Sequence, residues 1–159
     1  MKILVTAASK HGSTGEIADA IAAQLGKHGL DVVRADPDAV DVLTGFDGVV
    51  LGSAVYAGHW LKPALEFAER HAAELDRLPV WLFSSGPIAG KPTDEAPPPG
   101  TIEARSYRVF AGRLDRSLLG FGERTIAKAV RAPDGDFRDW VAVGAWADEI
   151  AATLTLAGV

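Results

Sequence analysis

The 159-residue chain contains no cysteine. This absence excludes disulfides, thiol nucleophiles, and zinc or iron–sulfur sites with cysteine ligands. The four histidines, at positions 11, 28, 59 and 71, do not have the spacing of a metal-binding motif such as H-E-x-x-H. We therefore expect no dedicated metal site.

Long apolar runs are also missing. No run approaches the roughly 20 residues that span a bilayer, and the N-terminus lacks the basic segment, apolar core and cleavage site of a signal peptide. The net charge of −5 argues against nucleic acid as the main partner. With 48% hydrophobic and 23% charged residues, the composition is that of an ordinary globular protein. We expect one cytoplasmic domain over residues 1–159.

Short apolar stretches alternate with amphipathic ones along the chain. Strands are predicted at residues 3–5, 30–33, 48–52, 79–83 and 107–112. Helices are predicted from about residue 14 to a stop at Gly29, over 61–75, and from 140 to 154. This alternation predicts an α/β fold, a doubly wound five-stranded parallel sheet with helices on both faces. Right-handed crossovers favour the strand order 2-1-3-4-5.

The stretch between the first strand and the first helix is rich in hydroxyl groups. Ser9, Ser13 and Thr14 supply hydroxyls, Lys10 supplies a positive charge, and Gly12 lets the backbone approach a ligand closely. Such a stretch at a helix N-terminus favours an anion, and a phosphate would fit. An ordinary strand-to-helix turn with Thr14 as N-cap explains the same residues.

Two further loops, 53–60 and 84–91, are predicted after the third and fourth strands. Ligands of doubly wound sheets bind outside the carboxyl ends of the strands, so the three loops are expected to converge on one site. The chain has neither G-x-G-x-x-G nor G-x-S-x-G. Residues 86–92 lack the spacing and the hydroxyl of a P-loop, and Thr6 and Ser53 stand where a receiver domain has carboxylates.

With these motifs excluded, the three loops resemble those of the flavodoxin family, and the likeness covers essentially the whole chain. Residues 8–14 are similar to the FMN phosphate loop, residues 51–59 to the loop on one face of the isoalloxazine, and residues 84–90 to the loop on the other side. The resemblance implies that FMN is bound by Ser9, Lys10, His11, Gly12, Ser13, Thr14, Ser53, Ala54, Val55, Tyr56, Ala57, Gly58, His59, Ser85, Gly86, Pro87, Ile88 and Gly90.

Within the family, the chain most resembles the menaquinone-dependent protoporphyrinogen IX dehydrogenases and their uncharacterised relatives. Residues 52–59, 70–72 and 109–114 carry this likeness, whereas the region 113–136 is shorter and less basic than in those dehydrogenases. The resemblance implies an FMN-dependent oxidoreductase that acts on a small substrate or a quinone, with a porphyrinogen among the candidates. An electron carrier between redox proteins and a non-catalytic flavin-binding protein are the alternatives.

Aromatic side chains near the second loop are candidates for contact with the flavin ring. Tyr56 is the first candidate to stack on it, the alternative being a surface tyrosine that packs on the next helix. His59 is a candidate for proton delivery to the ring, and Trp60 is expected in the core. His28 and His71 are expected on solvated helix flanks.

Two segments in the second half of the chain differ from the rest. Residues 92–105 are rich in proline and acidic residues and are expected to be poorly ordered, apart from a helical turn near 102–104. Residues 116–131 are predicted to form an amphipathic helix with basic side chains at 124, 128 and 131. Such a helix can dock peripherally on the inner face of a membrane, where a quinone is available, or on a protein partner. The alternative is a helix packed on the sheet with a solvated basic face.

Overall fold

A computed structural model describes residues 1–10, 12–56, 58–86, 98–100, 102–114, 135–136 and 138–157. The strands are β1 (Lys2–Ala8), β2 (Asp31–Ala35), β3 (Gly48–Tyr56), β4 (His59–Trp60), β5 (Val80–Gly86), β6 (Ser106–Ala111), β7 (Arg113–Leu114) and β8 (Gly135–Asp136). The helices are α1 (Ser13–Lys27), the 3-10 helix η1 (Pro37–Ala39), α2 (Lys62–Arg70), α3 (Ala72–Leu75) and α5 (Trp140–Ala157).

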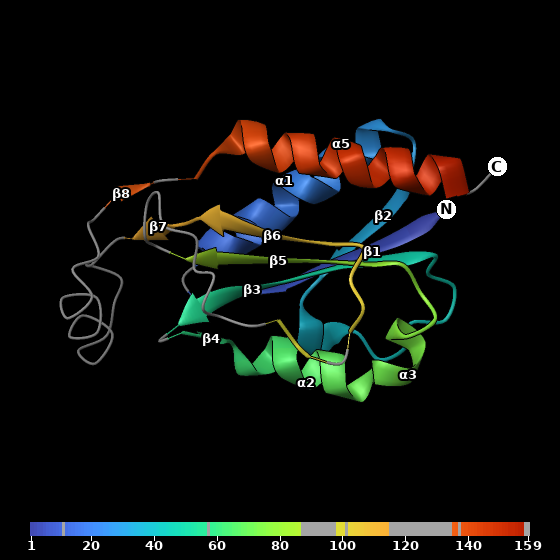
Figure 1. Cartoon of the computed structure of the whole chain (residues 1–159), viewed down its shortest axis with the longest axis horizontal. Coiled ribbons are helices and arrows are strands. Elements are labelled where there is room, and N and C mark those ends of the chain that lie inside the picture. Colours follow the sequence, from blue (N-terminus) through green and yellow to red (C-terminus); the bar gives the residue numbers. More distant parts are fainter. Residues whose placement is uncertain are drawn as a thin grey trace.

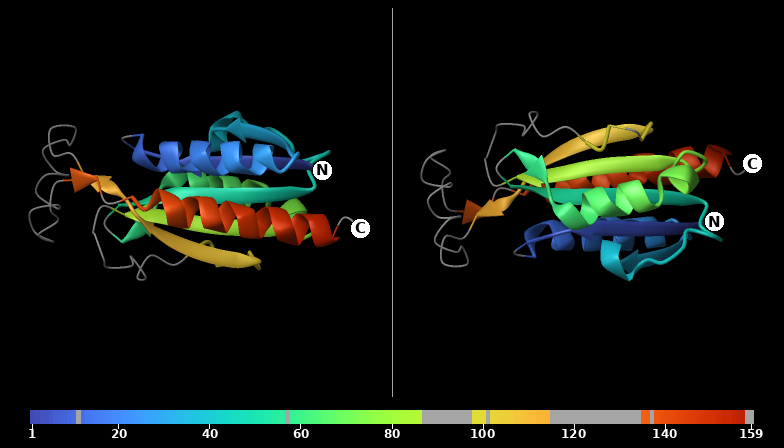
Figure 2. Two further views of the ribbon diagram at one scale, coloured as in Figure 1. Left: turned by 90° about the horizontal axis from the view of Figure 1, so that it is seen from above. Right: turned by 90° about the horizontal axis from the view of Figure 1, so that it is seen from below.

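The main sheet has the order β2-β1-β3-β5-β6, and all of these neighbours are parallel. Since β5 and β6 are the fourth and fifth predicted strands, the predicted order 2-1-3-4-5 is confirmed. Helices α1 and α5 cover one face of the sheet, and α2 and α3 cover the other (Figures 1 and 2). The arrowheads of β3, β5 and β6 point to the same side, away from the two labelled termini (Figure 1).

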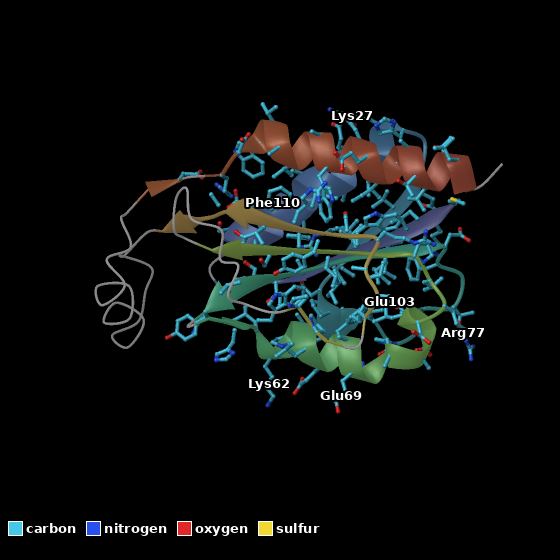
Figure 3. All side chains as sticks on the ribbon, in the orientation of Figure 1. Lys27, Lys62, Glu69, Arg77, Glu103 and Phe110 are labelled. Atoms are coloured by element: carbon cyan, nitrogen blue, oxygen red, sulfur yellow. The ribbon has the colours of Figure 1, made fainter. Side chains whose placement is uncertain are left out.

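Two apolar layers pack against the sheet, because side chains alternate between the faces of each central strand. On β1, Ile3 and Val5 are fully buried toward α1 and α5, whereas Leu4 is fully buried toward α2. Phe110 of β6 packs toward α5 (Figure 3). Its ring contacts the ring of Trp146 edge-on, with 5.7 Å between the two ring centroids. Burial of both faces explains why the central strands are continuous apolar runs in the sequence.

The central strands extend further than their apolar runs predict. β3 continues to Tyr56 and β5 to Gly86, so residues 53–56 and 84–86 are strand ends and not loops. The cause is pairing between the two strands, in which Ser53 lies opposite Ser84 and Ala54 opposite Ser85. Small residues on neighbouring strands thus continue the ladder where the apolar pattern stops.

The predicted helix over 61–75 is divided at His71 into α2 and α3. Trp60, just before it, is buried as predicted and belongs to β4. His71 itself is 3% exposed. Its Nε2 lies 3.3 Å from the carbonyl oxygen of Val40, and its ring packs against Phe67. The prediction of a solvated His71 was therefore wrong, because this side chain turns inward and joins the residue after η1 to the end of α2.

Other predictions for the connecting segments had mixed outcomes. Helix α1 ends at Lys27, and Gly29 follows with the left-handed φ of 82° that a helix stop favours. Residues 102–104 form no helical turn, and Ile102 packs against the apolar layer beside α2. The predicted basic helix over 116–131 lies outside the described residues. Within the described ranges, no helix is both long and apolar enough to cross a bilayer.

Candidate functional site

The three segments with predicted binding residues lie side by side at the carboxyl edge of the sheet. Ala8 at the end of β1 is opposite Ser53 of β3, and Ser53 is opposite Ser84 of β5. One position further along, Ala54 is opposite Ser85. The ends of β1, β3 and β5, which the three predicted loops follow, are therefore adjacent in the strand register.

The N-terminus of α1 lies at this edge and begins at a glycine. Gly12 is the N-cap residue with a left-handed φ of 85°, and because it has no side chain it makes no side-chain cap. The first helical hydrogen bond runs from the N–H of Glu16 to the carbonyl oxygen of Gly12, at 3.0 Å. Thr14 lies inside the helix and is 2% exposed, so the interpretation of Thr14 as N-cap is wrong. The first turn offers backbone N–H groups to an anion.

Ser9 adds a hydroxyl to this helix terminus. Its Oγ is buried and has no hydrogen-bond partner in the described part of the chain. An ideal Cβ on Gly15, in the first turn of α1, would lie 4.0 Å from that Oγ. A buried hydroxyl without a partner costs free energy. A phosphate group bound at the α1 terminus could accept a hydrogen bond from it, so this donor set fits the phosphate that the sequence predicts.

The second segment turns back on itself directly after β3. Tyr56 and His59 pair across an antiparallel two-residue ladder, and Gly58 between them has a left-handed φ of 78°. Tyr56 is half-buried and His59 is exposed. The Lys10 ammonium, from the first segment, lies 4.1 Å from the centroid of the Tyr56 ring. The first and second predicted segments are thus in direct contact.

Serine side chains on the other two strand ends face the protein interior. Ser53 is fully buried, and its hydroxyl donates to the carbonyl oxygen of Ala54 and accepts from the N–H of Leu61. Ser85 is also buried, and the backbone of Gly86 approaches Gly112 so closely that a Cβ on Gly112 would lie 2.4 Å from the Gly86 oxygen. Of the other predicted binding residues, His11, Ala57, Pro87, Ile88 and Gly90 lie outside the described residues.

Arg138 reaches the same helix terminus from the segment before α5, although sequence reasoning did not select it. Its side chain is 4% exposed and forms a bidentate pair with Asp136, at 2.9 and 2.7 Å. Its Nη1 lies 3.3 Å from Oε2 of Glu16 and 3.5 Å from the carbonyl oxygen of Ser13. Hydrogen bonding to Asp136 raises the pKa of Arg138 above its ordinary value. This residue joins the segment before α5 to the first turn of α1.

A second arginine, Arg34 on β2, approaches the first turn of α1 from the side of β2. An ideal Cβ on Gly15 would lie 3.5 Å from its Nη2. The Arg34 guanidinium is paired with Asp19 at 3.0 Å and lies 3.8 Å from Asp36. The position of Arg34 near the end of a predicted strand is a signal that could have placed it at this edge of the sheet.

Comparisons with known proteins identify the family to which this fold belongs. A family model described as a flavodoxin domain matches residues 4–140. The chain is 26% identical to protoporphyrinogen IX dehydrogenase (quinone) of Escherichia coli strain K12, with 95% of each chain covered. It is also 26% identical to the protein of that name from Leishmania major, with 95% of this chain and 75% of the relative covered.

Solved structures show the same fold. A cysteine mutant of flavodoxin from Pseudomonas aeruginosa superimposes with a TM-score of 0.63 at 15% identity, covering 98% of this chain and 99% of that one. The domain and the relatives together suggest a flavin-binding oxidoreductase. Because the family model spans most of the chain, the chain belongs to the flavodoxin family, whose fold implies flavin binding.

Proposed function

We propose that residues 1–159 form a single FMN-binding domain that acts as an oxidoreductase. In this proposal it passes electrons between a small reduced substrate and a quinone. The observation that carries the proposal is the Ser9 hydroxyl, which is buried without a hydrogen-bond partner among the described residues. It lies beside the first turn of α1, which begins at Gly12, at the edge where β1, β3 and β5 end. Such a terminus suits the phosphate of FMN.

The roles of the chain's residues follow from their positions. The Ser9 hydroxyl and the N–H groups of the first turn of α1 would bind the phosphate. Tyr56 would orient the flavin ring, and the backbone at Ser85 and Gly86 would help to hold it. The flavin itself supplies the electron-transfer chemistry when bound. The protein contributes binding, orientation and local charge.

The substrate part of the proposal rests on the relatives. Two curated relatives are named protoporphyrinogen IX dehydrogenase (quinone), which favours a porphyrinogen-like reductant and a quinone acceptor. The second candidate is an electron carrier between redox proteins, which the net charge of −5 favours because an acidic surface suits a basic protein partner.

Flavin binding is tested by titrating the purified chain with FMN and with riboflavin, which lacks the phosphate. We expect FMN to bind more tightly. Replacing Ser9 by Ala should weaken FMN binding about tenfold, because a hydrogen bond to a charged group is lost, and should leave riboflavin binding unchanged. Thr153→Ala serves as the control, since that hydroxyl donates to the Glu149 carbonyl oxygen of its own helix. Equal affinity for the two flavins, or no binding, would contradict the site.

The reaction is tested with the FMN-loaded protein, protoporphyrinogen and a quinone. Quinone-dependent oxidation that disappears without FMN would support the enzyme. If electrons leave the protein only when a second redox protein is supplied, the carrier is the better description. Tight FMN binding without transfer to either acceptor would leave a flavin-binding protein with no turnover of its own.

A further inference from the structure

The side chain of Lys10 departs from the role that its backbone suggests. Lys10 belongs to the segment before α1, where a positive charge would be expected to serve a phosphate. Its Nζ instead lies over the Tyr56 ring, 4.1 Å from the centroid. That distance is well inside the range of about 6 Å within which a cation is attracted to an aromatic face.

Tyr56 is a well-defined partner for this contact. It is the last residue of β3, and its backbone pairs with His59 across the turn that contains Gly58. The preceding pair joins Val55 to the buried Trp60. The turn is therefore anchored to the core at its base, and the position of the tyrosine is set by the sheet while its ring is held by Lys10.

We propose that Lys10 is a positioning residue for the ring end of the flavin site. Its ammonium fixes the Tyr56 ring and keeps a positive charge next to the bound isoalloxazine, and it contributes little to phosphate binding. This inference rests on the proposed flavin site and adds a role that the phosphate segment alone does not suggest. Positive charge near the ring favours the reduced, more negatively charged form of a flavin over the oxidised form.

The test compares FMN with riboflavin in the variants Lys10→Gln and Lys10→Arg. If Lys10 acts at the ring end, Lys10→Gln should lower the affinity for FMN and for riboflavin by the same factor. We expect about two- to fivefold, as for the loss of an exposed cation–π contact. Lys10→Arg should retain wild-type affinity, because arginine also stacks on tyrosine. In a Tyr56→Leu background, the effect of Lys10→Gln should disappear. A loss confined to FMN would assign Lys10 to the phosphate and refute the inference.

The midpoint potential of the bound flavin is the second readout. We expect Lys10→Gln to weaken binding of the reduced flavin about tenfold more than binding of the oxidised flavin. This change corresponds to a midpoint potential about 30 mV lower for a two-electron couple. Lys10→Arg should restore the wild-type potential. An unchanged potential in Lys10→Gln would refute the role in setting charge at the ring.

A matched control lies at the opposite end of β1 from Lys10. Lys2, at the start of β1, lies over the Phe46 ring at 5.2 Å, so Lys2→Gln removes the same charge and the same kind of contact far from the site. Both flavin affinities and the potential should stay at wild-type values. If the unsubstituted chain binds no flavin, the proposed function fails and this inference with it. If the chain binds flavin but Lys10→Gln behaves as Lys2→Gln, only the role of Lys10 fails.

Discussion

Replacing Arg138 by Met should separate the segment before α5 from the first turn of α1 and lower the stability of the protein. Methionine keeps an apolar stem of similar length and removes the guanidinium. The main lost contacts are the bidentate pair with Asp136 at 2.9 and 2.7 Å and the ion pair with Glu16 at 3.3 Å. The guanidinium also contacts the Ser13 carbonyl oxygen at 3.5 Å and lies over the Trp140 ring at 4.7 Å. Glu16 and Ser13 are distant from Arg138 along the chain, whereas Asp136 and Trp140 are its near neighbours.

The magnitude follows from the burial of each partner. The Arg138 side chain is 4% exposed, but Asp136 and Glu16 are 45% and 50% exposed and can be solvated once the arginine is gone. A hydrogen bond to a charged group contributes about 1.5–3 kcal/mol, and exposed pairs contribute about 0–1 kcal/mol. Arg138 is an intermediate case, so we expect Arg138→Met to lower the free energy of unfolding by about 1–2 kcal/mol. For a chain of this size, each kcal/mol lost lowers Tm by about 2–4 °C.

Urea unfolding followed by circular dichroism measures this loss, with Arg108→Met as the control. Arg108 pairs with Glu149 at 3.1 Å, but their side chains are 45% and 64% exposed, so the loss of this pair should cost less than about 1 kcal/mol. Because hydrogen bonding to Asp136 raises the pKa of Arg138, changing the pH cannot mimic the substitution by removing the charge of Arg138. Equal effects of Arg138→Met and Arg108→Met would refute the argument that Arg138 anchors this segment.

Three further predictions concern single positions. Gly12→Ala should destabilise α1 by about 1 kcal/mol and weaken FMN binding, because its φ of 85° disfavours alanine; unchanged urea and FMN titrations would contradict this. Gly52→Ala would place a Cβ 2.2 Å from the Phe83 ring and should cost about 1–3 kcal/mol in urea unfolding, partly recovered by adding Phe83→Leu; no recovery would contradict the steric reason. Hydrogen bonding to His28 lowers the pKa of Asp148, so the contribution of this pair to stability should be present above pH about 4 and lost as the pH falls further. Asp148→Asn should remove that part of the pH dependence of the unfolding midpoint, and an unaltered pH profile would contradict it.

The sheet order was predictable because the central strands are apolar on both faces and alternate with amphipathic segments. The strand ends were not predictable from this pattern. Ser53, Ser84 and Ser85 are small and polar, which is typical of loops, yet they continue the parallel ladder between β3 and β5. Their pairing depends on the neighbouring strand and not on their own composition. Residues predicted as loop therefore form the floor of the candidate site.

Buried polar side chains escaped prediction for a related reason. His71 is satisfied by the carbonyl oxygen of Val40, and Arg138 by Glu16, a residue more than a hundred positions earlier in the chain. No local periodicity marks such residues, because each becomes favourable inside the protein only after its distant partner has folded against it.

The charges at the candidate site follow the same logic. Arg34 and Arg138 both lie near the first turn of α1, but each arrives paired with carboxylates, Asp19 for the first and Asp136 and Glu16 for the second. Two arginines so paired add little net charge to the helix terminus. If the proposed function is correct, a phosphate at that terminus would be bound mainly by backbone N–H groups and the Ser9 hydroxyl, beside the left-handed turn at Gly12.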